Sequence, residues 1–252
     1  EELLQDRLPH EAFIPEETEW LEGLQAVQRD LIRKATREEQ PWKATIDLDA
    51  TVVESQKQEA YVTYLGEKGY QPVNAYWAEQ DLILADEFRD GNVPAQVDLL
   101  RVLKGAMAAL PPTVRLVRVR SDSAAYVHEL LDWCRKEIPG RPRIEFAISA
   151  DVTEELRAAI QAVPEEGWKP VRKVTDKGLI VGRKEWAEVE FVPSKPSRKK
   201  GMQPDRYLAI GIRPAQGELF QDGTPYHYFA VVTNIWSWDG ERLLQWQRER
   251  CG

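Results

Sequence analysis

The chain has 252 residues, of which 42% are hydrophobic and 30% charged, and this is the composition of a globular protein. A formal net charge of −8 counts against indiscriminate binding to nucleic acid, although local clusters of Lys and Arg decide where phosphates bind. No apolar run reaches the roughly 18 residues that indicate a membrane-spanning helix, so no membrane contact is expected.

The two cysteines, Cys134 and Cys251, lie far apart and outside any metal-binding spacing. This pattern excludes a disulfide framework and favours two free thiols in a cytoplasmic protein. The chain begins with Glu1 rather than Met and lacks the features of a signal peptide, so we expect a fragment or a trimmed form of a longer protein.

Residues 1–41 are predicted to form an N-terminal helical leader. A helix start follows Pro15, and apolar residues then recur at spacings of three and four before the helix ends near Pro41. These apolar positions are Trp20, Leu21, Leu24, Val27, Leu31 and Ile32.

Residues 42–163 carry the signals of a strand-rich segment followed by alternating helices and strands. In the first strand, residues 44–51, Asp47 and Asp49 share one face and apolar residues share the other. Further strands are predicted at 59–64, 73–77, 82–88, 114–123 and 144–149, and helices at 97–110, 124–136 and 153–163, the last with Thr153 as N-cap. This order predicts an α/β fold in which a mixed sheet is flanked by helices.

From residue 164 to residue 238, Gly, Pro, Lys and Trp dominate the sequence. Strand signals at 171–174, 186–192, 207–212 and 226–232 predict an antiparallel β-rich insertion. A basic cluster at its centre either grips phosphates or belongs to a solvated loop; its members are Lys195, Arg198, Lys199 and Lys200. Helical periodicity returns within residues 239–252.

Asp49 and Asp122 both come at the end of a predicted strand and precede small hydroxyl residues. A carboxylate at a strand end can point into a cleft, so two such acids suit a pair of divalent cations used for phosphoryl transfer. The alternative is that these acids face water, or that Asp122 caps the helix after it.

Four segments in this order resemble the catalytic domain of bacterial insertion-sequence transposases of the DDE type. The segments are IDLDATVV (46–53), FRDGNV (88–93), VRSDSAAY (119–126) and VTN (232–234). The resemblance implies a ribonuclease H-like core interrupted by a β-rich insertion. It implies Asp49 and Asp122 as the first two catalytic acids and metal ligands, Asp47 as an accessory residue, and two Mg²⁺ or Mn²⁺ ions in the complete site.

In that family the third acid lies on a helix after the insertion. Here the helix begins within residues 239–252, and the expected glutamate would fall beyond Gly252. Glu249 is the nearest substitute, in a poorly fitting register, so this fragment is expected to have an incomplete triad and little activity. Two alternatives stay open: another ribonuclease H-like nuclease or resolvase, and a non-catalytic DNA-binding remnant of a transposase.

The resemblance also implies DNA as partner, at transposon ends and target, with a homodimer in the full-length protein and a location at the nucleoid. The end-recognition domain that usually precedes such a core is not expected in these residues. Arg248 and Arg250 lie where relatives place a phosphate-contacting arginine. Trp236 is a candidate for stacking on a flipped base, although core packing is favoured for both Trp236 and Trp238.

Overall fold

The computed structural model describes residues 14, 16, 18–175, 178–193, 204–212 and 226–250. The chain divides into two compact units. Unit 1 contains residues 1–119 and 127–144, and unit 2 contains residues 120–126 and 145–252. Two strands, β7 (Leu116–Ser121) and β8 (Arg143–Ala150), therefore each contribute residues to both units.

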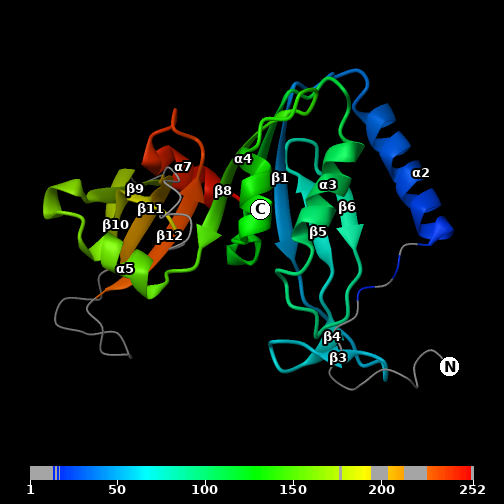
Figure 1. Cartoon of the computed structure of the whole chain (residues 1–252), viewed down its shortest axis with the longest axis horizontal. Helices are drawn as coiled ribbons and strands as arrows, with labels where there is room; N and C mark the ends of the chain where they lie inside the picture. Colours follow the sequence, from blue (N-terminus) through cyan, green and yellow to red (C-terminus); the bar gives the residue numbers. More distant parts are fainter. Residues whose placement is uncertain are drawn as a thin grey trace. The chain divides into compact units, whose positions relative to one another are not determined.

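The described part of unit 1 holds the first strands and three helices. Its elements are α2 (Glu19–Ala35), β1 (Lys43–Ala50), β2 (Val53–Glu54), β3 (Tyr61–Val62), β4 (Lys68–Tyr70), β5 (Val73–Trp77), β6 (Leu82–Glu87), α3 (Leu99–Ala109), most of β7 (Leu116–Ser121) and α4 (His128–Arg135). The strand order is β6-β5-β1-β7, with β1–β5 and β5–β6 antiparallel. In Figure 1, α3 lies against β5 and β6, and α2 contacts α3 and the edge strand β6.

The core of unit 1 follows from alternation along its strands. Ala44, Ile46 and Leu48 of β1 are fully buried on one face, as their two-residue spacing predicts. The buried stripe of α3 covers the sheet because its apolar residues recur at helical spacing; it consists of Leu99, Leu100, Val102, Leu103, Ala106 and Ala109.

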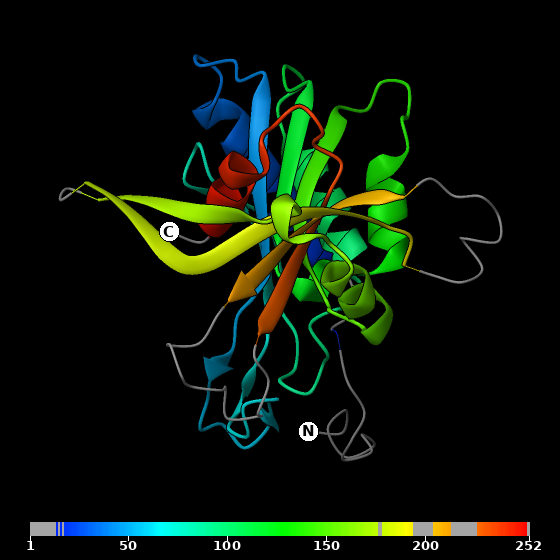
Figure 2. The same cartoon turned by 90° about the vertical axis from the view of Figure 1, so that its left-hand side faces the viewer.

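Unit 2 is built around the predicted insertion. Its elements are the end of β7, a 3-10 helix (Ser123–Ala125), most of β8 (Arg143–Ala150), α5 (Glu154–Gln161), a 3-10 helix (Glu165–Gly167), β9 (Lys169–Thr175), β10 (Gly178–Phe191), β11 (Asp205–Ile212), β12 (His227–Thr233) and α7 (Gly240–Arg248). The strand order is β7-β8-β12-β11-β10-β9, and β9 to β12 pair antiparallel in series (Figure 2). Because β12 also pairs antiparallel with β8, the insertion continues the sheet rather than standing apart from it.

The architecture is a mixed sheet flanked by helices, consistent with a ribonuclease H-like fold. β1 and β7 are neighbours in the strand order of this sheet. No helix in the described part of the chain is both long and apolar enough to cross a membrane.

One part of unit 1 differs from the prediction. Residues 59–64 do not add a strand to the main sheet; β3 instead joins β2 and β4 in a separate small sheet. β4 lies in the middle of this small sheet and pairs antiparallel with both β2 and β3. The tight packing explains this arrangement, since a side chain at Gly91 would collide with the carbonyl oxygen of Gly69 in β4.

Candidate functional site

The two acids of β1 occupy the same face at different depths. Asp47 is 1% exposed, whereas Asp49, two residues nearer the end of the strand, is only half-buried. The antiparallel pairing with β5 places Asp47 opposite Tyr76 and Asp49 opposite Asn74. Directly paired residues point to the same side of a sheet, so this face is polar along both strands.

The start of β1 is fixed by a polar contact on the same face. The Glu79 carboxylate accepts hydrogen bonds from Thr45 N (2.6 Å) and Thr45 Oγ1 (2.7 Å), and Lys43 Nζ lies 3.0 Å from it. Burial alone would raise the pKa of Glu79, but these hydrogen bonds and the Lys43 charge outweigh it and lower the pKa below its ordinary value.

Asp122 directly follows β7 and begins the 3-10 helix. Its Oδ1 accepts a hydrogen bond from Ala124 N at 3.0 Å, so the predicted alternative of a capping role is real. Capping does not exclude metal binding, because an ionised carboxylate has two oxygens and about four lone-pair sites. The cap instead holds the carboxylate group at the end of the strand.

The last turn of α7 is tied to the residues just before Asp122. Gln247, 8% exposed, donates from Nε2 to Ser149 Oγ (3.1 Å) and Ser121 O (3.4 Å). Arg120 Nη1 donates to Trp246 O at 2.6 Å, and its guanidinium lies 5.1 Å from the centre of the Trp246 ring. These contacts were not predicted, because they join residues 98 to 126 positions apart.

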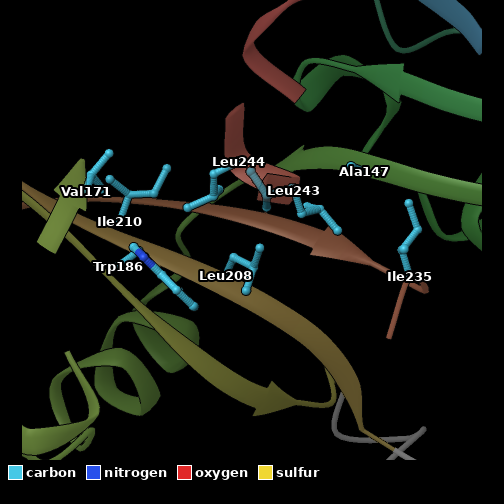
Figure 3. Close-up of a cluster of buried hydrophobic side chains, with 9 residues drawn as sticks. Ala147, Val171, Trp186, Leu208, Ile210, Ile235, Leu243 and Leu244 are labelled. Atoms are coloured by element: carbon cyan, nitrogen blue, oxygen red, sulfur yellow. The ribbon is translucent and has the colours of Figure 1, made fainter. Parts of the chain in front are cut away.

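A hydrophobic cluster holds α7 in this place. Leu243 and Leu244 pack into a group of buried side chains on the sheet of unit 2 (Figure 3). The other members are Ala147, Val171, Trp186, Leu208, Ile210, Val231 and Ile235. Asp239 caps the start of the helix, because its Oδ1 accepts a hydrogen bond from Glu241 N at 2.8 Å.

A pocket of about 460 Å³ lies in unit 2 next to the Asp122 turn. Ser123, the residue after Asp122, lines it together with Lys184 and Arg248. Asp151 adds a carboxylate, and side chains of β11 and β12 supply apolar walls. Burial lowers the pKa of Arg248, which still remains protonated at neutral pH.

The other two candidate residues, Glu249 and Arg250, lie at the C-terminal end of α7 and outside the pocket. Glu249 is an exposed residue at the C-cap of the helix, and its backbone N–H donates to Gln245 O and Trp246 O at 3.3 Å. Arg250 is half-buried and follows the helix. Neither residue lines the pocket beside Asp122.

The VTN segment joins the end of β12 to β8. Thr233 Oγ1 donates to Phe146 O (2.7 Å), and Asn234 Oδ1 accepts from Phe146 N (2.8 Å). The two side chains thereby continue the hydrogen bonding of the strand pair past Thr233, the last paired residue of β12.

The FRDGN segment (88–92) contains a buried arginine that is paired with an acid. Arg89 is fully buried, and its Nε lies 2.7 Å from Glu87 Oε1. Arg101 Nη2 binds the other oxygen of Glu87 at 2.6 Å. Burial lowers the pKa of Arg89, and the Glu87 charge opposes that shift. The segment also pairs Asp90 with Tyr70 of β4.

The two tryptophans of the insertion have separate environments. Trp238 packs edge-on against Trp246 (5.4 Å between ring centres), as the core-packing prediction requires. For Trp236 that prediction is wrong: its side chain is 57% exposed, with the Arg206 guanidinium 5.8 Å from its ring centre. Arg206 is held in place by Glu188 at 2.8 Å.

Part of the predicted DNA-binding set lies outside the described residues. The basic cluster is Lys195, Arg198, Lys199 and Lys200.

The two predicted metal ligands lie in different units: Asp49 belongs to unit 1 and Asp122 to unit 2. Within the part of the chain that the structure describes, no three His, Cys, Asp or Glu side chains are grouped so that they could hold a metal ion.

Comparison with known proteins identifies one protein family. Residues 7–194 match a family model described as transposase DDE domain group 1. No curated protein matches the chain. The matched segment runs from before α2 into the insertion and contains both Asp49 and Asp122.

Proposed function

Because this chain belongs to the transposase DDE domain family, group 1, we propose that it forms the catalytic domain of a DNA transposase that acts by metal-dependent phosphoryl transfer at insertion-sequence ends. The observation that carries the proposal is the family match over residues 7–194. The matched segment contains Asp49, near the end of β1, and Asp122, directly after β7, and carboxylates of this kind support the same chemistry.

Asp49 and Asp122 are the residues that we propose as metal ligands. Their carboxylate oxygens are the donors that Mg²⁺ and Mn²⁺ prefer. Asp47 is almost fully buried, so we assign it the accessory role of supporting Asp49 from within the strand. Bound cations would supply activation of a water or 3′-hydroxyl nucleophile and stabilisation of the leaving oxygen.

The fold contributes orientation of the Asp122 carboxylate. The hydrogen bond from Ala124 N restrains it, and Gln247 and Arg120 anchor α7 to the strand end just before it. Groups that are held before the reaction begins lose little freedom in the transition state, which lowers the barrier.

Lys184 and Arg248 are the residues that we propose to bind DNA phosphates beside Asp122. Both line the same pocket, and pairs of cations position nucleic-acid backbones without reading sequence. The double variant Lys184→Ala/Arg248→Ala should reduce DNA affinity by the same factor for all sequences. The slope of log affinity against log salt concentration should become shallower by about 1 for each residue removed. Binding by fluorescence anisotropy over a salt series measures both. Glu190→Ala, an exposed position on β10 outside the pocket lining, is the control.

Titration calorimetry of Mn²⁺ tests the metal ligands directly. We expect binding by the unmodified chain that weakens in Asp49→Ala and in Asp122→Ala but not in Glu22→Ala, an exposed acid on α2. If both aspartate variants bound Mn²⁺ as well as the parent chain, the assignment of these ligands would be wrong.

The reaction products distinguish a transposase from the rival nuclease function. In the full-length protein a transposase joins the cleaved 3′ end to a second DNA, whereas a nuclease or resolvase of the same fold does not integrate it. Joined products on a gel, absent in Asp49→Asn and Asp122→Asn, support transposition. Hydrolysis alone would favour a nuclease, and DNA binding without either product would favour the non-catalytic remnant.

A further inference from the structure

Helix α2 carries an apolar seam that the described residues of its own unit leave exposed. The seam consists of Trp20 (87% exposed), Leu24 (69%), Val27 (58%) and Leu31 (61%). Spacings of four, three and four residues align these side chains on one side of the helix. A row of large apolar residues exposed to water marks an interaction surface.

A different face of α2 anchors the helix to unit 1. Ile32 is 4% exposed, Gln28 Nε2 donates to Ile83 O of β6 (3.1 Å), and Arg33 Nη2 donates to Ala108 O of α3 (3.3 Å). The seam is therefore held in a fixed helical conformation, without being used in the packing of the helix against β6 and α3. A partner that binds it does not have to order the helix first.

The spacing of the seam favours a second copy of this chain as the occupant. Alternating spacings of four and three residues are those of the two core positions in the heptad repeat of a coiled coil. The pattern is symmetric about its centre, so an antiparallel copy related by a two-fold axis would place Trp20 against Leu31 of the second copy, and Leu24 against Val27. Self-complementary pairing of this kind is what a two-fold interface requires.

The charges at the ends of α2 favour the same arrangement. Glu19 lies in the first turn and Lys34 in the last. In an antiparallel pair the acidic end of one helix lies beside the basic end of the other, and the helix dipoles oppose each other favourably. A parallel pair would bring like charges together.

We propose that the seam of α2 is a homodimer interface in which two copies of the helix pack antiparallel. The proposal is independent of the catalytic assignment, because it uses none of the residues placed near Asp49 or Asp122.

Sedimentation velocity over a range of concentrations tests the dimer. We expect Leu24→Glu and Val27→Glu to weaken dimerisation by roughly 30-fold or more, the effect typical of a central interface residue. Ala26→Glu, exposed on the same helix outside the seam, should dimerise like the parent chain. Circular dichroism melts at a monomeric concentration should be alike for all variants. A monomer at every concentration, or a dimer indifferent to both seam variants, would overturn the proposal.

Disulfide trapping tests the orientation. In a Cys251→Ser background, Leu24→Cys and Val27→Cys chains carrying tags of different size are mixed and oxidised. If the helices pack antiparallel, a disulfide should form between the Leu24→Cys chain and the Val27→Cys chain. Little cross-linking is expected when either variant is oxidised alone. Strong cross-linking of Leu24→Cys to itself would indicate a parallel pair and contradict the arrangement.

Discussion

At the scale of single residues, Glu79 connects the fold of β1 to pH. Hydrogen bonds and the Lys43 charge lower the pKa of Glu79 in the folded chain, despite burial. The ionised group therefore stabilises the fold above its unfolded pKa of about 4.3, and this contribution disappears as the pH falls through the lower folded value. The stability difference between the parent chain and Glu79→Gln should shrink in acid, as urea titrations from pH 7 to pH 3 would reveal. A constant difference would contradict this role.

Cys134 should be inert in the folded protein. Burial raises the pKa of its thiol to about 12, and the nearby Arg141 and Arg135 charges only partly oppose that shift. The reactive thiolate is then scarce at neutral pH and is also shielded from reagents. In Cys251→Ser, a disulfide reagent should label almost nothing in buffer and one thiol per chain in denaturant. Rapid labelling of the native variant would show that the thiol is accessible.

Residue-scale predictions from sequence succeeded where the signal was local. Thr153 was predicted as an N-cap, and its Oγ1 accepts from Leu156 N at 3.3 Å. The alternation of β1 correctly separated its apolar face from the face of Asp47 and Asp49. The contacts of Gln247 and the burial of Arg89 were missed, because a single sequence carries no record of which distant residues meet.

At the scale of elements, two glycines in helices should respond oppositely to alanine. A side chain at Gly240, the first residue of α7, would collide with the Trp186 ring, whereas nothing lies within 4 Å of a side chain at Gly23 in α2. Gly240→Ala should destabilise by roughly 1–3 kcal/mol through overpacking. Gly23→Ala should stabilise by roughly 0.5–1 kcal/mol because alanine favours helix. Urea unfolding measures both, and equal effects would show that the packing of α7 on Trp186 is loose.

The order of helices and strands along the chain was predictable from the sequence, whereas the pairing of the strands was only partly predictable. The succession of strands and helices from β5 to α7 follows from periodicity and from turn signals. The small sheet of β2, β3 and β4 was not predicted, since its strands are two or three residues long, and β3 and β4 are packed closely against the FRDGN segment. Such strands have too few residues to display alternation.

At the scale of the whole molecule, the two units should unfold together. The chain passes between them within β7 and near the start of β8, so neither unit keeps its full set of strands when the other is lost. We expect one cooperative urea transition, with coincident midpoints from tryptophan fluorescence and far-ultraviolet circular dichroism. Separate midpoints would show that the units are thermodynamically independent.

The pairing of β12 with β8 has a consequence for synthesis on the ribosome. Ala147 pairs with Thr233, so β8 is made long before its partner strand exists. At about 5–20 residues per second the intervening stretch takes seconds to translate. During that time one edge of β8 offers unpaired backbone groups to any other strand, which is a route to aggregation. The nascent chain therefore passes through a stage in which chaperone protection of this edge matters more than at any point after β12 has docked.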